Sequence, residues 1–255
     1  MKKLLLFMAM TGSVYAQRML PEELAIARSI TMQEAGEVQA TPGVEFFKLP
    51  DEKLLTVGSD FEYGLSDRVE LDAEVPYVFR NPNHGRSVSG IGDIEVAARY
   101  SFVPMTEKSP FAFNAGLSVT TPNGSRDKEL GEGQVALGPF FTASEWLGPV
   151  NVQLNCAWAH VVTNGGEEPR DEFEYNVSVV YPVRGWFFVL EGNGESNHRQ
   201  TKYYLTPEVV WRPKHSFQIQ LAAPIGLTRA AGDYGLIASV SFEFDGPFAH
   251  GRDND

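Results

Sequence analysis

The sequence predicts an all-β protein, a single up-and-down antiparallel transmembrane barrel of about 12 strands. Apolar and polar residues alternate with a period of two along most of the chain, which indicates sheets with one apolar and one polar face. The connections between the predicted strands alternate between short and long. Aromatic residues gather near both ends of the strands, as expected at the two interfaces of a bilayer.

The predicted strands account for most of the chain after an N-terminal segment. Their connections are short at one end of the barrel and long at the other, except that the first connection, 49–52, is short where a long one is due. Outer-membrane barrels have this asymmetry, with short periplasmic turns and longer external loops. The expected strands are 36–48, 53–63, 68–80, 91–103, 110–121, 133–144, 149–161, 172–182, 186–195, 202–212, 215–224 and 233–244.

Composition excludes several other classes of protein. The chain has 255 residues, with 33 acidic against 21 basic ones and a net charge of −12. This balance lacks the basic face that nucleic-acid phosphates require, so we expect no nucleic-acid partner. No run of about 18 apolar residues follows residue 16, which argues against a helical membrane protein. Cys156 is the only cysteine, so no intrachain disulfide can form.

The N-terminal residues have the three-part pattern of a secretory signal peptide. Lys2 and Lys3 precede the apolar run 4–10, and small or neutral residues lead to Ala16. We expect cleavage after Ala16 and location in the outer membrane of a Gram-negative bacterium. The expected division is 1–16 signal peptide, 17–35 N-terminal segment, 36–244 barrel and 245–255 C-terminal tail.

The segment 17–35 contains a stretch, 21–34, that the sequence predicts to be helical. Pro21 suits a first helical turn, and acidic residues follow it, which favours a helix N-terminus. Leu24, Ala27 and Ile30 would then share one face. Such a helix would enter the lumen as a plug or lie in the periplasm, and a disordered leader is the alternative.

Alternation alone does not say which face of the barrel is apolar. A soluble barrel turns its apolar face inward, and a membrane barrel turns it outward. Two aromatic belts, an even strand count that brings both termini to the short-turn end, and a last strand ending on Phe244 favour the membrane arrangement. The tight-end belt is expected to include Trp146.

Four short motifs recur at strand ends and turns. They are Glu62, Gly64, Asp67 and Arg68; Val75, Pro76 and Tyr77; Gly90, Gly92 and Asp93; and Thr121, Pro122 and Gly124. Together they resemble the outer-membrane family named for the meta-pathway of phenol degradation, over about residues 36–244. The resemblance implies a barrel that acts as a transporter, possible substrates being aromatic or other hydrophobic compounds. Gly64 reads as the positive-φ residue of a tight hairpin, and Gly90 and Gly92 as a bulge or close approach.

The polar face of such a barrel lines the lumen and carries mainly carboxylates. This predicts a channel or transporter for small solutes, with an acidic lumen that favours neutral or cationic ones. A closed structural or surface-interaction barrel is the alternative. The expected lumen-lining residues are Asp60, Glu62, Glu70, Asp72, Glu74, Asp93, Glu95, Arg99, Glu174, Glu191, Glu208, Arg212 and Glu243.

The sequence predicts no catalytic residue, no metal site and no cofactor. Its five histidines occur in no hydrolase or metalloprotease motif, and its acidic residues lack calcium-loop spacing. An outer-membrane lipid hydrolase is therefore a remote second alternative. The expected partners are outer-membrane lipid, the barrel assembly machinery and a small-molecule solute of unknown identity.

Overall fold

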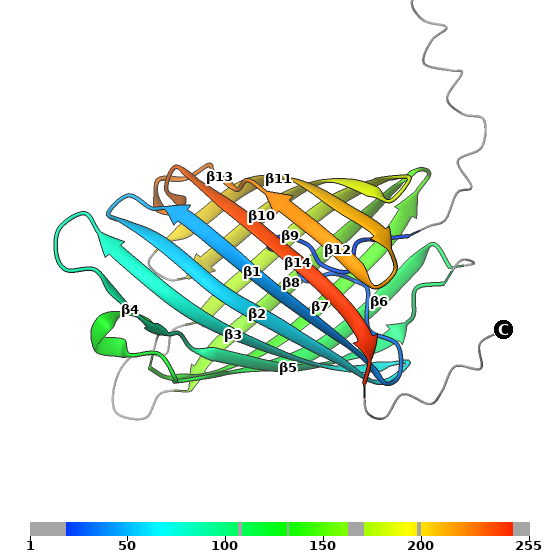
Figure 1. Cartoon of the computed structure of the whole chain (residues 1–255), viewed down its shortest axis with the longest axis horizontal. Helices are drawn as coiled ribbons and strands as arrows, with labels where there is room; N and C mark the ends of the chain where they lie inside the picture. The colour runs from blue at the N-terminus through cyan, green and yellow to red at the C-terminus, as the bar shows by residue number, and fades with distance from the viewer. Residues whose placement is uncertain (1–18, 107–108, 132, 163–170, 198–199, 247–255) are drawn as a thin grey trace, which may run out of the picture.

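The computed structural model describes residues 19–106, 109–131, 133–162, 171–197 and 200–246. The predicted signal peptide and most of the C-terminal tail lie outside these residues. The described chain forms one closed antiparallel barrel (Figure 1). Its strands are β1 (Glu37–Lys48), β2 (Glu52–Ser66), β3 (Val69–Pro82), β4 (Val88–Ile91), β5 (Ile94–Val103), β6 (Phe111–Thr121), β7 (Val135–Leu147), β8 (Val150–Val162), β9 (Asp171–Val183), β10 (Trp186–Asn197), β11 (Thr201–Lys214), β12 (Phe217–Ala222), β13 (Ile225–Gly226) and β14 (Tyr234–Asp245).

The barrel has twelve strand positions, because two positions are each divided into two short strands. β4 and β5 both pair with β3, and β12 and β13 both pair with β11 and β14. Neighbours in the chain are otherwise neighbours in the sheet. β14 pairs with β1 from Glu37–Asp245 to Lys48–Tyr234, so the sheet has no open edge at this seam. The predicted all-β, twelve-strand barrel is confirmed.

Several breaks in the regular pairing occur at proline or glycine residues. The register of β1 with β14 has a gap at Thr41 and Pro42, and proline has no N–H to donate there. Gly92 lies between β4 and β5, where a Cβ would come 3.0 Å from Pro76 Cγ. At Gly90 a Cβ would come 2.9 Å from Leu130 Cδ1. The predicted close approach at these two glycines is confirmed.

The two ends of the barrel differ as the sequence predicts. At one end the connections are short; β9 and β10 are joined by Arg184 and Gly185 alone, both with positive φ, which is the geometry of a type I′ hairpin turn. We call this the tight end. At the other end, the loop end, the connections are longer and include two 3₁₀ turns, η1 (Arg126–Lys128) and η2 (Arg229–Ala231). No helix in the described residues is long and apolar enough to cross a membrane.

Side chains alternate across the barrel wall. In β10, Trp186, Phe188 and Leu190 are exposed on the outer surface, whereas the intervening Phe187 and Val189 are buried inside. Large exposed apolar side chains recur on the outer face of nearly every strand. An outer surface of this kind suits lipid, so the assignment of the apolar face to the outside is confirmed.

The tight end also holds apolar side chains on the inner face. Trp146, which the sequence places in the outer aromatic belt, is buried inside the barrel instead, with Val180, Phe187 and Val210. The register explains this: Trp146 pairs with Asn151, which is also inward and fully buried, so both belong to the lumen row. The part of the lumen near the tight end is therefore a packed core.

Candidate functional site: the barrel lumen and its inserted segment

Residues 19–34, which we call the inserted segment, lie inside the barrel (Figure 1). The backbone N–H groups of Ala25 and Ala27 donate to the Glu191 carboxylate at 3.1 and 2.9 Å. The N–H of Ile30 donates to Gln153 Oε1 at 3.0 Å. No described residue of the segment is helical, so the predicted helix over 21–34 is wrong. Its predicted position as a plug agrees with these contacts.

The hydrogen bonds of the inserted segment explain why it is not a helix. In a helix, each interior N–H group would donate to the carbonyl four residues earlier in the same segment. Here Glu191 and Glu208, on β10 and β11, accept N–H groups from residues 25–27. These side-chain oxygens take the place of the carbonyl four residues back, which would accept the same N–H groups in a helix. Tertiary contacts thus override the local helix preference.

Apolar packing holds the inserted segment at the tight end. Leu20, Leu24, Ala27 and Ile30 are all buried there. They pack in one cluster with inward-facing strand residues; these are Ala112, Trp146, Val180, Phe187, Val189 and Val210. Leu24, Ala27 and Ile30 do share a buried face, as the sequence suggests, but a bent, non-helical chain presents them rather than a helix. Burial of such side chains stabilises the insertion by roughly 1.5–3 kcal/mol for each large one.

Gly64 allows the end of the inserted segment to pass close to the backbone of β2. A Cβ at this position would lie 2.0 Å from the carbonyl oxygen of Glu34, at the base of the inserted segment. The N–H of Gly36 then donates to the Gly64 carbonyl at 2.7 Å. Gly64 lies within β2 and is not among the residues with positive φ. The predicted hairpin role of Gly64 is therefore wrong, and close backbone approach is what requires glycine here.

Arg99 is the central cation of the lumen. Its guanidinium bonds the carboxylates of Glu70 and Glu62, the latter at 3.1 Å, and donates to the Ser29 carbonyl at 2.8 Å. Gln33 of the inserted segment joins the same cluster, because its backbone N–H donates to Glu70 at 2.5 Å and its side chain to Glu62 at 3.1 Å. Arg99, Glu62 and Glu70 are all buried. The cluster therefore joins the inserted segment to β2, β3 and β5.

Arg212 plays a similar part near the tight-end mouth. It pairs with Glu22 of the inserted segment and with Glu243 of β14, the latter at 3.3 Å. It also donates to the Leu20 carbonyl at 3.2 Å. β11 and β14 thus hold the segment through one buried guanidinium.

Above the inserted segment, toward the loop end, the lumen encloses a cavity of ≈ 500 Å³. Three cations line it, Arg28, Arg99 and Lys202. Arg28 pairs with Glu95, and Lys202 with Glu195 at 2.5 Å. The nine carboxylates that line it are Glu23, Glu45, Asp60, Glu62, Asp72, Glu74, Glu95, Glu174 and Glu195. Carboxylates therefore outnumber cations threefold in the lining.

The residues that the sequence predicts to line the lumen fall into three groups in the structure. One group contacts the inserted segment or Arg212 and does not line the cavity: Glu70, Glu191, Glu208, Arg212 and Glu243. Asp93 forms a group of its own, because it accepts the Gly124 N–H at 2.8 Å and so holds the loop after β6. The group that lines the cavity is Asp60, Glu62, Asp72, Glu74, Glu95, Arg99 and Glu174.

The cavity also has lining residues that the sequence analysis did not single out. Glu45 continues the inward row of β1 and could have been found from its alternation with Val44 and Phe46. Phe47 and Tyr204 add an aromatic pair, with ring centroids 5.8 Å apart. Arg28 and Glu23 come from the inserted segment, and no periodicity places them in the lumen.

Residues 33–244 match the model of the family described as "Putative MetA-pathway of phenol degradation". The chain belongs to this family. The match spans the whole barrel and begins within the inserted segment. A comparison with curated protein sequences gave no significant match.

Solved structures similar to this member of the phenol-degradation family are outer-membrane channels and porins. An outer membrane channel from Pseudomonas putida F1 has a TM-score of 0.64 and 14% identity, with 83% of this chain and 97% of that chain covered. The KdgM porin has a TM-score of 0.56 and 9% identity, with 80% and 99% covered. The NanC porin has the same TM-score and identity, with 80% and 98% covered. At these identities the likeness shows the fold, an outer-membrane β-barrel.

Proposed function

We propose that the protein is an outer-membrane channel for small neutral or cationic solutes, with the inserted segment as its plug. The lining of the 500 Å³ cavity carries this proposal. Its nine acidic side chains outnumber its three cationic ones threefold. Charge of one sign inside a low-dielectric wall attracts counter-ions and repels ions of the same sign.

The apolar part of the lining narrows the class of solute. Phe47 and Tyr204 lie in the same cavity as Leu54 and Ile237, beside the carboxylates. This combination suits a small aromatic or otherwise amphiphilic molecule that is neutral or positively charged. A KdgM porin was solved with oligogalacturonate, which is a polyanion. The carboxylates of this lumen would repel such a ligand, so we do not propose an oligogalacturonate as the solute of this chain.

A closed barrel without transport is the second candidate, and the packing at the tight end favours it. There the inserted segment and the inward apolar side chains form a continuous buried cluster. In the channel proposal this cluster must open, whereas in a purely structural barrel it stays closed.

Conductance in a planar bilayer separates the two candidates. We expect the full chain to conduct weakly, and a variant lacking residues 19–34 to show a larger single-channel conductance, because the lower lumen loses its filling. Glu191→Gln with Glu208→Gln should raise the open probability without shortening the chain, since both side chains hold the segment's backbone. If the deletion variant folds but does not conduct, the barrel is structural.

Selectivity is the second part of this experiment. The channel should prefer cations, and Asp60→Asn, Glu74→Gln and Glu174→Gln together should reduce the preference, because all three side chains line the cavity. Added salt should weaken it by screening. Asp51→Asn, Asp127→Asn and Glu145→Gln change the same number of carboxylates at exposed sites and form the control. Anion selectivity, or an equal effect of both triple variants, would contradict the acidic-lumen proposal.

Orientation in the membrane can be tested by labelling. We expect the loop end, with Arg126, to face the outside and the tight end, with Lys214, to face the periplasm. Arg126→Cys and Lys214→Cys in a Cys156→Ser background would be treated on intact cells with an impermeant thiol reagent. Labelling at 126 and not at 214 is expected, and the reverse pattern would overturn the orientation.

A further inference from the structure

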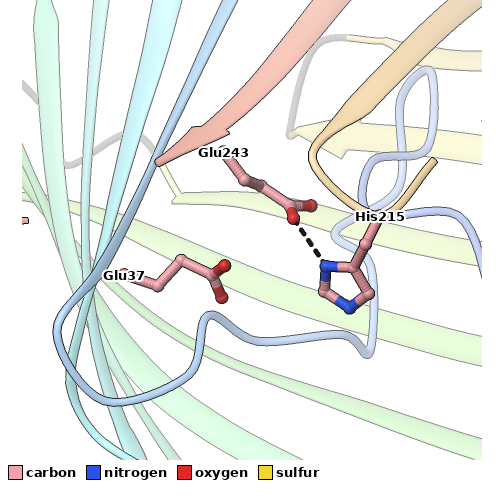
Figure 2. A group of neighbouring side chains, drawn as sticks. All are labelled: Glu37, His215 and Glu243. Carbon is pink, nitrogen blue, oxygen red and sulfur yellow. Dashed lines mark hydrogen bonds and ion pairs between the residues drawn. The ribbon is translucent and has the colours of Figure 1, made fainter. Parts of the chain in front are cut away.

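Three potential metal ligands meet at the tight-end mouth, outside the cavity described above. They are Glu37 at the start of β1, His215 in the turn after β11, and Glu243 near the end of β14 (Figure 2). His215 Nδ1 and Glu243 Oε2 are 2.8 Å apart. One ligand atom from each of the three residues lies within 4.8 Å of the other two. The Glu37 carboxylate faces the same gap as the imidazole ring.

The surroundings of this triad favour a cation. A second cavity of ≈ 190 Å³ lies beside it, between the inserted segment and the barrel wall. Its lining includes Glu22, Glu34 and Asp67 in addition to Glu37, His215 and Glu243. Arg212 contacts Glu22 and Glu243, and its single charge offsets only part of this negative lining. The cavity gives an ion room beside the triad.

Hydrogen bonds orient both carboxylates of the triad. Arg212 bonds Glu243 Oε1, which leaves Oε2 directed at the gap. The backbone N–H of Glu34 donates to Glu37 Oε2 at 3.3 Å and leaves the other oxygen free of that bond. Ligating carboxylates in metal sites are commonly oriented by such bonds. Glu243 is nearly fully buried and fixed, whereas the His215 side chain is 60% exposed and can adjust.

We propose that Glu37, His215 and Glu243 bind a divalent metal ion of the zinc class. One imidazole nitrogen with two carboxylate oxygens and a water suits Zn²⁺, while Ca²⁺ and Mg²⁺ take oxygen ligands alone. With metal–ligand bonds of about 2.0–2.2 Å, ligand atoms lie roughly 3.4 Å apart. His215 Nδ1 therefore moves away from Glu243 Oε2, now 2.8 Å distant, while the Glu37 carboxylate adjusts to the ion, so movement of His215 and Glu37 is enough. The other acidic group found among the described residues, Glu62, Glu70 and Asp72, already holds the Arg99 guanidinium.

A bound ion would join parts of the chain that are distant in sequence. Glu37 and Glu243 lie on opposite sides of the seam between β1 and β14, and His215 adds the turn between β11 and β12. Glu37 lies two residues beyond Ala35, the first residue after the inserted segment. The ion would therefore stabilise the closed seam and the base of the segment together. This binding does not depend on whether the barrel transports a solute.

Calorimetric titration of ZnCl₂ into the purified, refolded full chain in detergent tests the site. We expect one ion per chain, with affinity reduced by about tenfold or more in His215→Gln and in Glu37→Gln. His160→Gln is the matched control, because His160 also pairs with a carboxylate, Asp171, at 2.6 Å, but at the loop end. The His160→Gln variant should bind Zn²⁺ as tightly as the unaltered protein. MgCl₂ and CaCl₂ should not compete.

Two further measurements keep the test decisive if a variant folds poorly. The shift in electrophoretic mobility between heated and unheated samples reports whether each variant has formed its barrel. Zinc-edge X-ray absorption of the unaltered protein should show one imidazole and a shell of oxygen ligands. The proposal is overturned if the unaltered protein binds no Zn²⁺, if the absorption spectrum lacks imidazole, or if folded His215→Gln and Glu37→Gln bind as tightly as His160→Gln.

Discussion

Arg99→Met is expected to destabilise the folded barrel by about 3–5 kcal/mol. The guanidinium of Arg99 is the shared partner of Glu62 and Glu70, and both carboxylates are buried. Methionine fills a similar volume but leaves these two acids next to each other without a cation. The Ser29 carbonyl also loses its donor, so the inserted segment is loosened as well. Folding titrations in lipid vesicles measure the change in free energy of unfolding.

The double variant Arg99→Met, Glu70→Gln should recover part of the loss, because it removes one of the two unpaired charges. Arg68→Met is the matched control; Arg68 is exposed in the turn between β2 and β3, and its replacement should change stability by less than about 0.5 kcal/mol. If Arg99→Met costs no more than Arg68→Met, the buried cluster is not what holds the segment.

Leu117→Arg is expected to cost about 2–4 kcal/mol of folding free energy in vesicles. Leu117 lies about midway along β6, between Ala98 and Pro139 of the neighbouring strands, and half of its side chain is exposed on the outer face. An arginine there must either enter hydrocarbon or distort the bilayer around it. No change of packing inside the barrel accompanies the substitution, so the cost reports the lipid environment.

Thr120→Arg, three residues further along the same strand, provides the comparison. The Thr120 hydroxyl donates to Glu95 at 3.3 Å, and Glu95 lines the cavity. A new arginine at this position has Glu95 and Glu174 as nearby carboxylates in an aqueous space, and its cost should be much smaller than that of Leu117→Arg. Similar costs for both variants, or a larger cost for Thr120→Arg, would reverse the assignment of the two faces.

The fold could be predicted because its determinants are local. Alternation in a strand such as β9, where Val177 and Val179 face outward and Asn176 and Ser178 inward, needs no knowledge of the neighbouring strands. Turn chemistry is equally local, as Arg184 and Gly185 show. Strand number and the position of the short turns follow from these two signals. The family that the short motifs resemble is the one whose model matches the chain.

The lumen could be predicted only in part, because its contents depend on distant contacts. The inserted segment loses its helical preference to Glu191 and Glu208, which lie more than 160 residues further along the chain. Trp146 reads as membrane-facing from the sequence, whereas in the structure it packs inside the barrel with Phe187 and the inserted segment. The metal-ligand triad draws on positions 37, 215 and 243, so no short-range spacing motif reveals it.

The enclosed position of residues 19–34 also fixes the order in which the chain can complete its fold. The Glu191 carboxylate that accepts the Ala27 N–H is separated from it by 164 residues, so docking must wait until β10 has joined the sheet. The seam requires β14, which is the last strand of all. The earliest described residues thus reach their native position among the last, and a chain truncated before β10 would leave Ala25 and Ala27 without the Glu191 acceptor that holds them.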